Sequence, residues 1–129
     1  MYDFLYIKEG DRQWQVPFAE ILYFESDDKY AKVITTKREY LTAQPLSVVQ
    51  KALPSNLFIR IHRFYIISLF HTSSFNKTVA HVGNKEIPVG KQYKEVLNNS
   101  VLSLSNNPAY CTKLSNYDLL ALFRKIGFN

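Results

Sequence analysis

One segment, residues 58–67, constrains the fold of this 129-residue chain more than any other. It reads Phe-Ile-Arg-Ile-His-Arg-Phe-Tyr-Ile-Ile, apolar enough for a core strand but with three ionisable side chains. Because a strand turns every second side chain to the same face, one unbroken strand cannot bury both Phe58 and Ile61. We therefore expect a bend in the segment that turns His62 and Arg63 outward. Guanidinium and imidazole groups on a rigid β frame are suited to contact phosphates and base edges.

The rest of the chain predicts a mainly β fold of short antiparallel strands. Its 9 Tyr and 9 Phe favour strands, since aromatic side chains fit a pleated surface. Turn residues such as Gly10 and Gly83-Asn84 separate the apolar stretches, as they do in hairpins. The expected strands outside the central bend are residues 4–8, 13–16, 21–25, 30–35, 38–42, 66–71, 77–82 and 85–89. Two small helices are expected, at residues 45–53 and 91–98.

The sequence changes character near residue 100, which predicts two parts. Residues 1–100 are expected to form one domain, and residues 101–129 a polar linker and a C-terminal amphipathic helix. Four apolar side chains of that helix recur at helical spacing, namely Leu119, Leu122, Phe123 and Ile126. A helix this short is unstable alone in water, so we expect it to dock on the domain or on a second copy.

Charge is distributed unevenly along the chain. Residues 1–28 hold two basic residues against seven acidic ones, whereas residues 29–129 hold fourteen basic residues against four acidic ones. Four basic residues, Lys29, Lys32, Lys37 and Arg38, follow one another with no acidic residue between them. This distribution indicates one face that binds a polyanion, although a solvated surface of uneven charge is an equal alternative.

The sequence offers little for catalysis, cofactors or a membrane. A single Cys111 excludes an internal disulfide and favours a reducing compartment, and the three histidines are spaced unlike any familiar zinc site. We see no leader peptide, no membrane-spanning run, no phosphate-binding glycine loop and no nucleophile elbow. We therefore expect a cytoplasmic protein that is not an enzyme and carries no cofactor.

Three blocks of sequence, in order, resemble the LytTR family of bacterial DNA-binding domains. The first is Ile-Leu-Tyr-Phe-Glu-Ser at residues 21–26, followed by Lys29-Tyr30. The second is the central segment 58–67, and the third is Ile-Pro-Val-Gly-Lys-Gln-Tyr at residues 87–93. The resemblance covers roughly residues 3–98, which is far more specific than any single motif.

The resemblance implies an elongated stack of short antiparallel β-sheets with one small helix, whose loops enter successive major grooves of double-stranded DNA. It implies a promoter-binding output domain, often preceded by a receiver or sensor domain and often acting as a homodimer on paired sites. Carried over position by position, the expected DNA-binding residues are Lys29, Tyr30, Lys32, His62, Arg63, Phe64, Lys91, Gln92 and Lys94.

The residues also allow plainer interpretations. In our hypothesis, Arg63 contacts a guanine base or a phosphate. The alternative is that Arg63 forms a surface ion pair with Asp27 or Asp28, which would contribute little to stability. For His62 we favour a supporting role that orients its neighbour. Three positions depart from the family pattern: Ala31 stands where some members carry a polar base-reading side chain, Phe64 replaces a common serine, and Ser68 replaces a common asparagine. The operator sequence is therefore not predictable.

Two other functions remain open from the sequence. A protein-interaction module would use the aromatic-rich sheets and leave the basic charge incidental. A β platform with exposed aromatic side chains would instead bind single-stranded nucleic acid. Preference for duplex DNA, for single strands or for neither separates these hypotheses.

Overall fold

The computed structural model describes residues 3–104. The chain divides into two compact units, Met1–Lys94 and Glu95–Asn129. The amphipathic helix expected at residues 119–126 lies outside the described residues, and the expected boundary near residue 100 stays a prediction. Within the described part, no helix has the length and apolar character needed to cross a bilayer.

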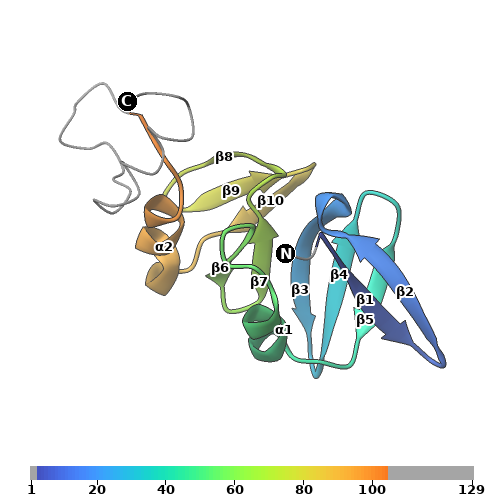
Figure 1. Ribbon diagram of the computed structural model, residues 1–129. Helices are drawn as coiled ribbons and strands as arrows, with labels where there is room; N and C mark the ends of the chain where they lie inside the picture. The colour runs from blue at the N-terminus through green and yellow to red at the C-terminus, as the bar shows by residue number, and fades with distance from the viewer. Residues whose placement is uncertain (1–2, 105–129) are drawn as a thin grey trace, which may run out of the picture. The chain divides into compact units, whose positions relative to one another are not determined.

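The first unit is built from three antiparallel sheets, as expected for a mainly β fold (Figure 1). A two-stranded hairpin pairs β1 with β2, a five-stranded sheet has the order β5-β4-β3-β7-β6, and a three-stranded sheet has the order β10-β9-β8. The strands are β1 Phe4–Glu9, β2 Arg12–Pro17, β3 Ile21–Asp27, β4 Tyr30–Thr35, β5 Glu39–Thr42, β6 Phe58–His62, β7 Tyr65–Ser68, β8 Thr72–Phe75, β9 Val79–Val82 and β10 Lys85–Pro88.

Short helical segments connect these strands. A 3-10 turn, η1 (Phe18–Glu20), follows Pro17, whose fixed φ suits the start of a helical turn. Helix α1 (Leu46–Ala52) joins β5 to β6 within the range expected from apolar spacing. The helix expected at 91–98 is split into a 3-10 turn, η2 (Lys91–Tyr93), and α2 (Lys94–Asn99).

The main core lies between the hairpin, helix α1 and one face of the five-stranded sheet. Its fully buried members include Val16 of β2, Ile21 and Phe24 of β3, and Val33 of β4. The ring of Phe24 packs edge-to-face against Phe58, with 5.7 Å between the ring centroids. Tyr23 and Ile67 lie opposite one another on the other face of the sheet, because side chains alternate along a strand. Both are buried, so the sheet is covered on this face as well in its centre.

The central segment folds as two strands with a bend, as predicted. β6 and β7 pair from Phe58 opposite Ser68 to His62 opposite Tyr65, with a register shift between Arg60 and His62. The extra residue at the shift lets Ile61 be fully buried while the strand still ends in an outward turn.

One strand was missed. The sequence predicted a single strand over residues 66–71, whereas β7 ends at Ser68 and β8 begins at Thr72. Thr72 bonds back across the gap, with its hydroxyl donating to the Ser68 carbonyl at 2.7 Å. The sequence of β8 is Thr-Ser-Ser-Phe, and none of these four side chains is buried. It therefore has no alternation of apolar and polar residues from which a strand could be predicted.

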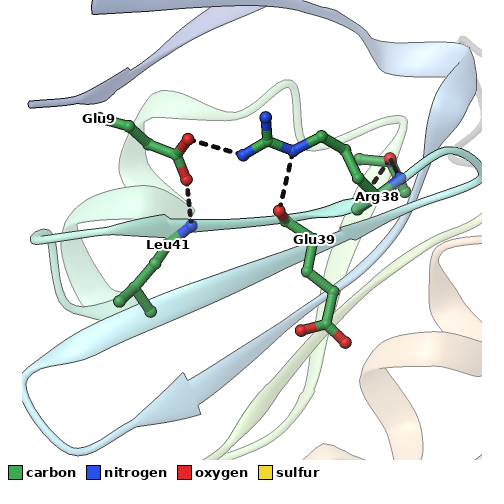
Figure 2. A network of polar contacts seen from close by, with 5 residues as sticks. Glu9, Arg38, Glu39 and Leu41 are labelled. Carbon is green, nitrogen blue, oxygen red and sulfur yellow. Dashed lines mark hydrogen bonds and ion pairs between the residues drawn. The ribbon is translucent and has the colours of Figure 1, made fainter.

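A polar network fastens the hairpin to β5, the edge strand of the five-stranded sheet (Figure 2). One carboxylate oxygen of Glu9 lies 2.6 Å from the Arg38 guanidinium, and the other accepts the backbone N–H of Leu41 at 3.2 Å. The guanidinium also stacks over the ring of Tyr40 at 3.9 Å. The Leu41 N–H is thereby removed from the exposed edge, where an open donor would invite strand pairing.

Glu9→Gln should accelerate hydrogen exchange at the Leu41 amide. The Leu41 N–H and then the Arg38 guanidinium lower the pKa of Glu9, so the stability that this carboxylate adds is present above its unfolded-state pKa of about 4.3. It is lost as the pH falls through the lower pKa of the folded state. The protection factor of the Leu41 amide, which is its intrinsic exchange rate divided by the rate measured by NMR, should therefore fall at low pH in the natural chain but much less in the variant. An equal pH response in both would contradict this role.

Candidate nucleic-acid interface

Three turns that are far apart in the sequence meet at one end of the five-stranded sheet. They are the β3–β4 turn at Asp28-Lys29, the β6–β7 turn at Arg63-Phe64, and the start of η2. The N–H of Ser26 donates to the Phe64 carbonyl at 2.8 Å, which ties the first turn to the second. The N–H of Gly90 donates to the Ile61 carbonyl at 2.8 Å, which ties η2 to the second turn. The three blocks of the sequence motif thus form one surface.

Strand register places a row of side chains across the sheet at this end. Lys32 lies opposite Glu25, Glu25 lies opposite Tyr65, and Tyr65 lies opposite His62. Residues opposite one another in antiparallel strands project to the same face, so Lys32 and His62 share a face of the sheet. Burial and the Glu25 carboxylate raise the pKa of Tyr65, whose hydroxyl lies 3.5 Å from Glu25 Oε1. That hydroxyl donates to the Glu25 carboxylate.

The β6–β7 turn is held from within by Arg60, which sequence analysis did not select. Its Nε donates to the His62 carbonyl at 3.2 Å, and one terminal nitrogen donates to the Arg63 carbonyl at 2.6 Å. The other terminal nitrogen donates to Gln50 Oε1 of helix α1 at 3.2 Å. Arg60 is therefore a positioning residue that fixes the backbone of the turn against α1. The only sequence signal was a charge at a half-buried strand position.

His62 supports the same turn, as favoured from the sequence. Its Nδ1 accepts the backbone N–H of Phe64 at 3.1 Å, so the neutral ring carries its proton on Nε2. The ring also lies 5.5 Å from the Phe64 ring and 5.6 Å from the Tyr65 ring, centroid to centroid. The imidazole is thus fixed in orientation, with Nε2–H as its remaining donor.

Arg63 stacks on the neighbouring aromatic ring. Its guanidinium carbon lies 4.5 Å from the centroid of Phe64, whose side chain is 42% exposed. Among the ion pairs of residues 3–104, none joins Arg63 to Asp27 or Asp28, the alternative considered from the sequence. Stacking leaves the N–H edge of the guanidinium open to a partner, because only its face is used.

The other predicted site residues surround these two turns and η2. Lys29 and Tyr30 are exposed in the β3–β4 turn, where Asp28 adopts a positive φ of 57°. Lys32 forms a 3.8 Å ion pair with Asp27, and both side chains are largely exposed. In and after η2, the exposed residues are Lys91, Gln92 and Lys94.

Gly90 allows η2 to approach the turn closely. A Cβ at this position would lie 3.1 Å from the Tyr93 ring and 3.7 Å from the His62 Cα. A side chain here would therefore crowd the Tyr93 ring, whereas its contact with His62 would be an ordinary one.

Two basic residues grouped with Lys29 and Lys32 in the sequence lie elsewhere. β4 begins beside the three turns and ends at Thr35, so Lys37 and Arg38 follow its opposite end. Lys37 pairs with Glu20 at 2.8 Å, and Arg38 pairs with Glu9 at 2.6 Å. The expectation of a four-residue basic cluster was therefore wrong, because the acidic partners are distant in sequence and could not be seen there.

Position 31 cannot supply a base contact. Ala31 is fully buried in the core beside β3, so a polar base-reading side chain is absent at this place in the surface. Neighbouring Tyr30 and Lys32 are accessible instead. Within residues 3–104, no three His, Cys, Asp or Glu side chains gather to hold a metal ion.

Acidification should loosen the β6–β7 turn through His62. Burial, and then the charges of Arg63 and Arg60, lower the pKa of His62 below the usual 6.5. The unfolded chain therefore takes up the proton first, and stability falls as the pH drops from 6.5 towards the lower folded-state pKa. Protonated Nδ1 cannot accept the Phe64 N–H, so the Phe64 amide should shift in an NMR titration over this range. In His62→Gln the Phe64 amide should stay in place, and an unchanged titration would contradict this origin.

The chain is similar in sequence to known proteins. The chain is 31% identical over 89 residues to sensory transduction protein LytT of Bacillus subtilis, which covers 64% of this chain and 36% of LytT. It is 32% identical over 68 residues to the CO-responsive transcriptional regulator RcoM of Rhodospirillum rubrum, covering 53% of this chain and 29% of RcoM. The chain therefore spans about a third of the length of these curated relatives.

A solved structure shares the fold. It is the LytTr DNA-binding domain of a Bacillus cereus protein described as a methyl-accepting/DNA response regulator, with a TM-score of 0.68 and 24% sequence identity. The superposition covers 78% of this chain and 97% of that domain. A family model, the LytTr DNA-binding domain, matches residues 11–101, which is more than half of the chain. This chain belongs to the LytTr DNA-binding domain family.

Proposed function

We propose that this chain binds double-stranded DNA sequence-specifically, as the output domain of a bacterial transcription regulator. The observation that carries the proposal is the convergence of three turns at one end of the sheet, joined by the Ser26–Phe64 and Gly90–Ile61 hydrogen bonds. A rigid base allows the turns to keep their spacing when they meet a duplex. Separate flexible loops would lose conformational entropy on binding.

Within this surface, the proposed base contacts come from the β6–β7 turn. The stacked guanidinium of Arg63 presents paired N–H donors, which match O6 and N7 of guanine in the major groove. His62 Nε2–H adds a single donor of fixed direction, and the exposed ring of Phe64 offers apolar contact to a thymine methyl group. Gln92 can pair with adenine N6 and N7.

The proposed phosphate contacts come from the lysines around the turns, Lys29, Lys32, Lys91 and Lys94. The carboxylates of Glu25 and Asp27 lie among them, so the surface is less positive than its lysines alone suggest. Acidic groups repel phosphates and thereby confine the backbone to the basic positions. Tyr30 is placed to donate to a phosphate through its hydroxyl.

Arg60→Met should lower the preference for a specific site over random duplex by roughly tenfold. The change keeps the side-chain volume but removes the donors for the His62 and Arg63 carbonyls, and a hydrogen bond from a charged group is worth about 1.5–3 kcal/mol. Gln50→Ala removes only the outer partner of Arg60 and should have a smaller effect. Competition binding measures both ratios. Equal ratios for Arg60→Met and the natural chain would show that Arg60 does not position the turn.

The relatives' names suggest a wider setting for this proposal. LytT is named as a sensory transduction protein and RcoM as a CO-responsive transcriptional regulator. We accordingly propose that this domain works downstream of a receiver or sensor, in the cytoplasm where promoter DNA is found. Two copies bound to paired sites are part of the same proposal.

Selection from a library of random duplexes tests the proposed function. The 129-residue chain should enrich a defined motif, and the enriched duplex should outcompete random duplex. If the four lysines each neutralise one phosphate, log K should fall with log salt concentration at a slope of about −3.6. Preference for single strands over duplex, or a slope near zero, would overturn the proposal.

A further inference from the structure

A groove runs along β1, on a part of the first unit that the three turns do not include. It has a volume of about 670 Å³. Every residue from Phe4 to Lys8 lines it. The side chains of these residues alternate between the two faces of the hairpin, so a groove that contacts all of them must run along the edge of β1. Besides β1, the groove is bordered by Val48 and Val49 of helix α1 and by residues 42–44 at the end of β5, and its interior is closed by core side chains of the sheet.

The backbone of β1 along this groove has no partner strand among the described residues. The hairpin loop is Gly10-Asp11, and a two-residue loop closes on a hydrogen-bonded pair, here Glu9 and Arg12. Hydrogen-bonded and open pairs alternate, so Lys8, Tyr6 and Phe4 occupy the open pairs. Their N–H and C=O groups therefore point away from β2 and towards the groove.

Pro17 independently fixes this register. It lies opposite Phe4, at an open pair where a residue needs no N–H for the ladder. Pro17 also blocks one donor on the outer edge of β2, whose other outward residues are Gln13 and Gln15. The outer edge of β2 is thus protected against pairing in the usual way, whereas the edge of β1 is not.

The side chains along the groove favour an extended, largely apolar occupant. Phe4 is 39% exposed, Tyr6 54% and Val48 46%, which are high values for large apolar side chains. Lys8 is the charged side chain that lines the groove, and no ion pair of the described residues includes it. A free cation at one end of an apolar groove is complementary to an acidic side chain.

We propose that the groove binds an extended peptide segment of a partner protein, which adds to the hairpin as a strand beside β1. Backbone groups of the segment pair with Phe4, Tyr6 and Lys8, and alternate apolar side chains enter the groove between β1 and α1. An acidic residue of the segment lies against the Lys8 ammonium group. The hairpin then becomes a three-stranded sheet.

Selection from a displayed library of random octapeptides, with the intact 129-residue chain as bait, tests this proposal. We expect enriched peptides with apolar residues at every second position and an Asp or Glu at one end. With Lys8→Glu as bait, the enriched end residue should change to Lys or Arg. Because Lys8 is exposed on the surface, this variant should fold normally.

Two proline variants test the strand pairing itself. Tyr6→Pro removes an N–H that points into the groove, and Gln15→Pro removes an N–H of the directly opposite residue that points to the other side. Both changes fall on the same cross-strand pair, and both remove the 3.2 Å hydrogen bond from Gln15 Nε2 to the Tyr6 hydroxyl. An enriched peptide should bind Tyr6→Pro about fivefold or more weakly, which corresponds to one lost hydrogen bond, and bind Gln15→Pro unchanged.

The proposal is overturned if no alternating pattern is enriched or if both proline variants weaken binding equally. It is also overturned if the edge of β1 pairs with a second copy of this chain, seen as a dimer by light scattering that Tyr6→Pro abolishes. Binding of the selected DNA duplex by Lys8→Glu should match that of the natural chain. Failure of DNA binding in all chains would affect the proposed function and leave the peptide result standing.

Discussion

Arg63→Ala should reduce the preference for the selected duplex over random duplex between about fivefold and 150-fold. A bidentate contact to a base is worth about 1–3 kcal/mol of discrimination. The effect should be near the upper end because the guanidinium is held by its stack on Phe64 and by a turn that Arg60 braces. Arg63→Lys keeps the charge but not the fork of donors, so it should restore non-specific affinity and leave the preference low.

Lys37→Ala is the matched control for Arg63→Ala. It also removes one exposed positive charge, but from the opposite end of β4, where Lys37 pairs with Glu20. Competition binding with fluorescent duplex at fixed salt should give the natural preference for this variant. If Lys37→Ala and Arg63→Ala reduce binding alike and without change in preference, the effect is one of net charge, and base reading by Arg63 is contradicted.

Phe24→Ala should lower the free energy of unfolding by about 3–5 kcal/mol, a large share of the 5–15 kcal/mol that is usual for a domain. The side chain is 1% exposed, and its ring packs against Phe58, so truncation leaves a cavity between β3 and β6. β3 also carries the first of the three turns. Urea denaturation followed by tryptophan fluorescence measures the loss, since Trp14 is the chain's single tryptophan.

Two further variants serve as controls for the loss of stability in Phe24→Ala. Phe70 is 75% exposed, so Phe70→Ala should change the free energy of unfolding by no more than about 0.5 kcal/mol. Phe24→Leu retains most of the apolar volume and should cost less than Phe24→Ala. Comparable losses in Phe70→Ala and Phe24→Ala would mean that the core lies elsewhere than between the hairpin, α1 and the sheet.

Local sequence patterns predicted most of the fold correctly. The bend in residues 58–67 was predicted because Phe58 and Ile61 cannot both face the core from one unbroken strand. In the structure, a register shift between Arg60 and His62 allows both to be buried. The turn predicted at Gly10 likewise lies in the loop of the first hairpin, and the strand predicted at residues 30–35 coincides with β4. β8 could not be predicted in this way, because its mostly polar residues show no apolar periodicity. It is a strand because its backbone pairs with β9, and a local sequence pattern does not reveal that pairing.

The three blocks of sequence predicted where the three turns lie, but the sequence could not show which basic residues already have acidic partners. Arg38 pairs with Glu9 across 29 positions and so joins the hairpin to the start of β5. Arg60 was missed for the related reason that its partners are backbone carbonyls, which every residue possesses.

The most direct test of the proposed DNA surface is an NMR titration of the ¹⁵N-labelled chain with the selected duplex. We expect large shifts of the backbone amides of Lys29, Arg63 and Lys91, which represent the three turns. The amides of Lys37 and Arg38, at the other end of the sheet, should move little. Shifts concentrated at Lys37 and Arg38, or spread evenly over the chain, would contradict a duplex-binding surface formed by the three turns.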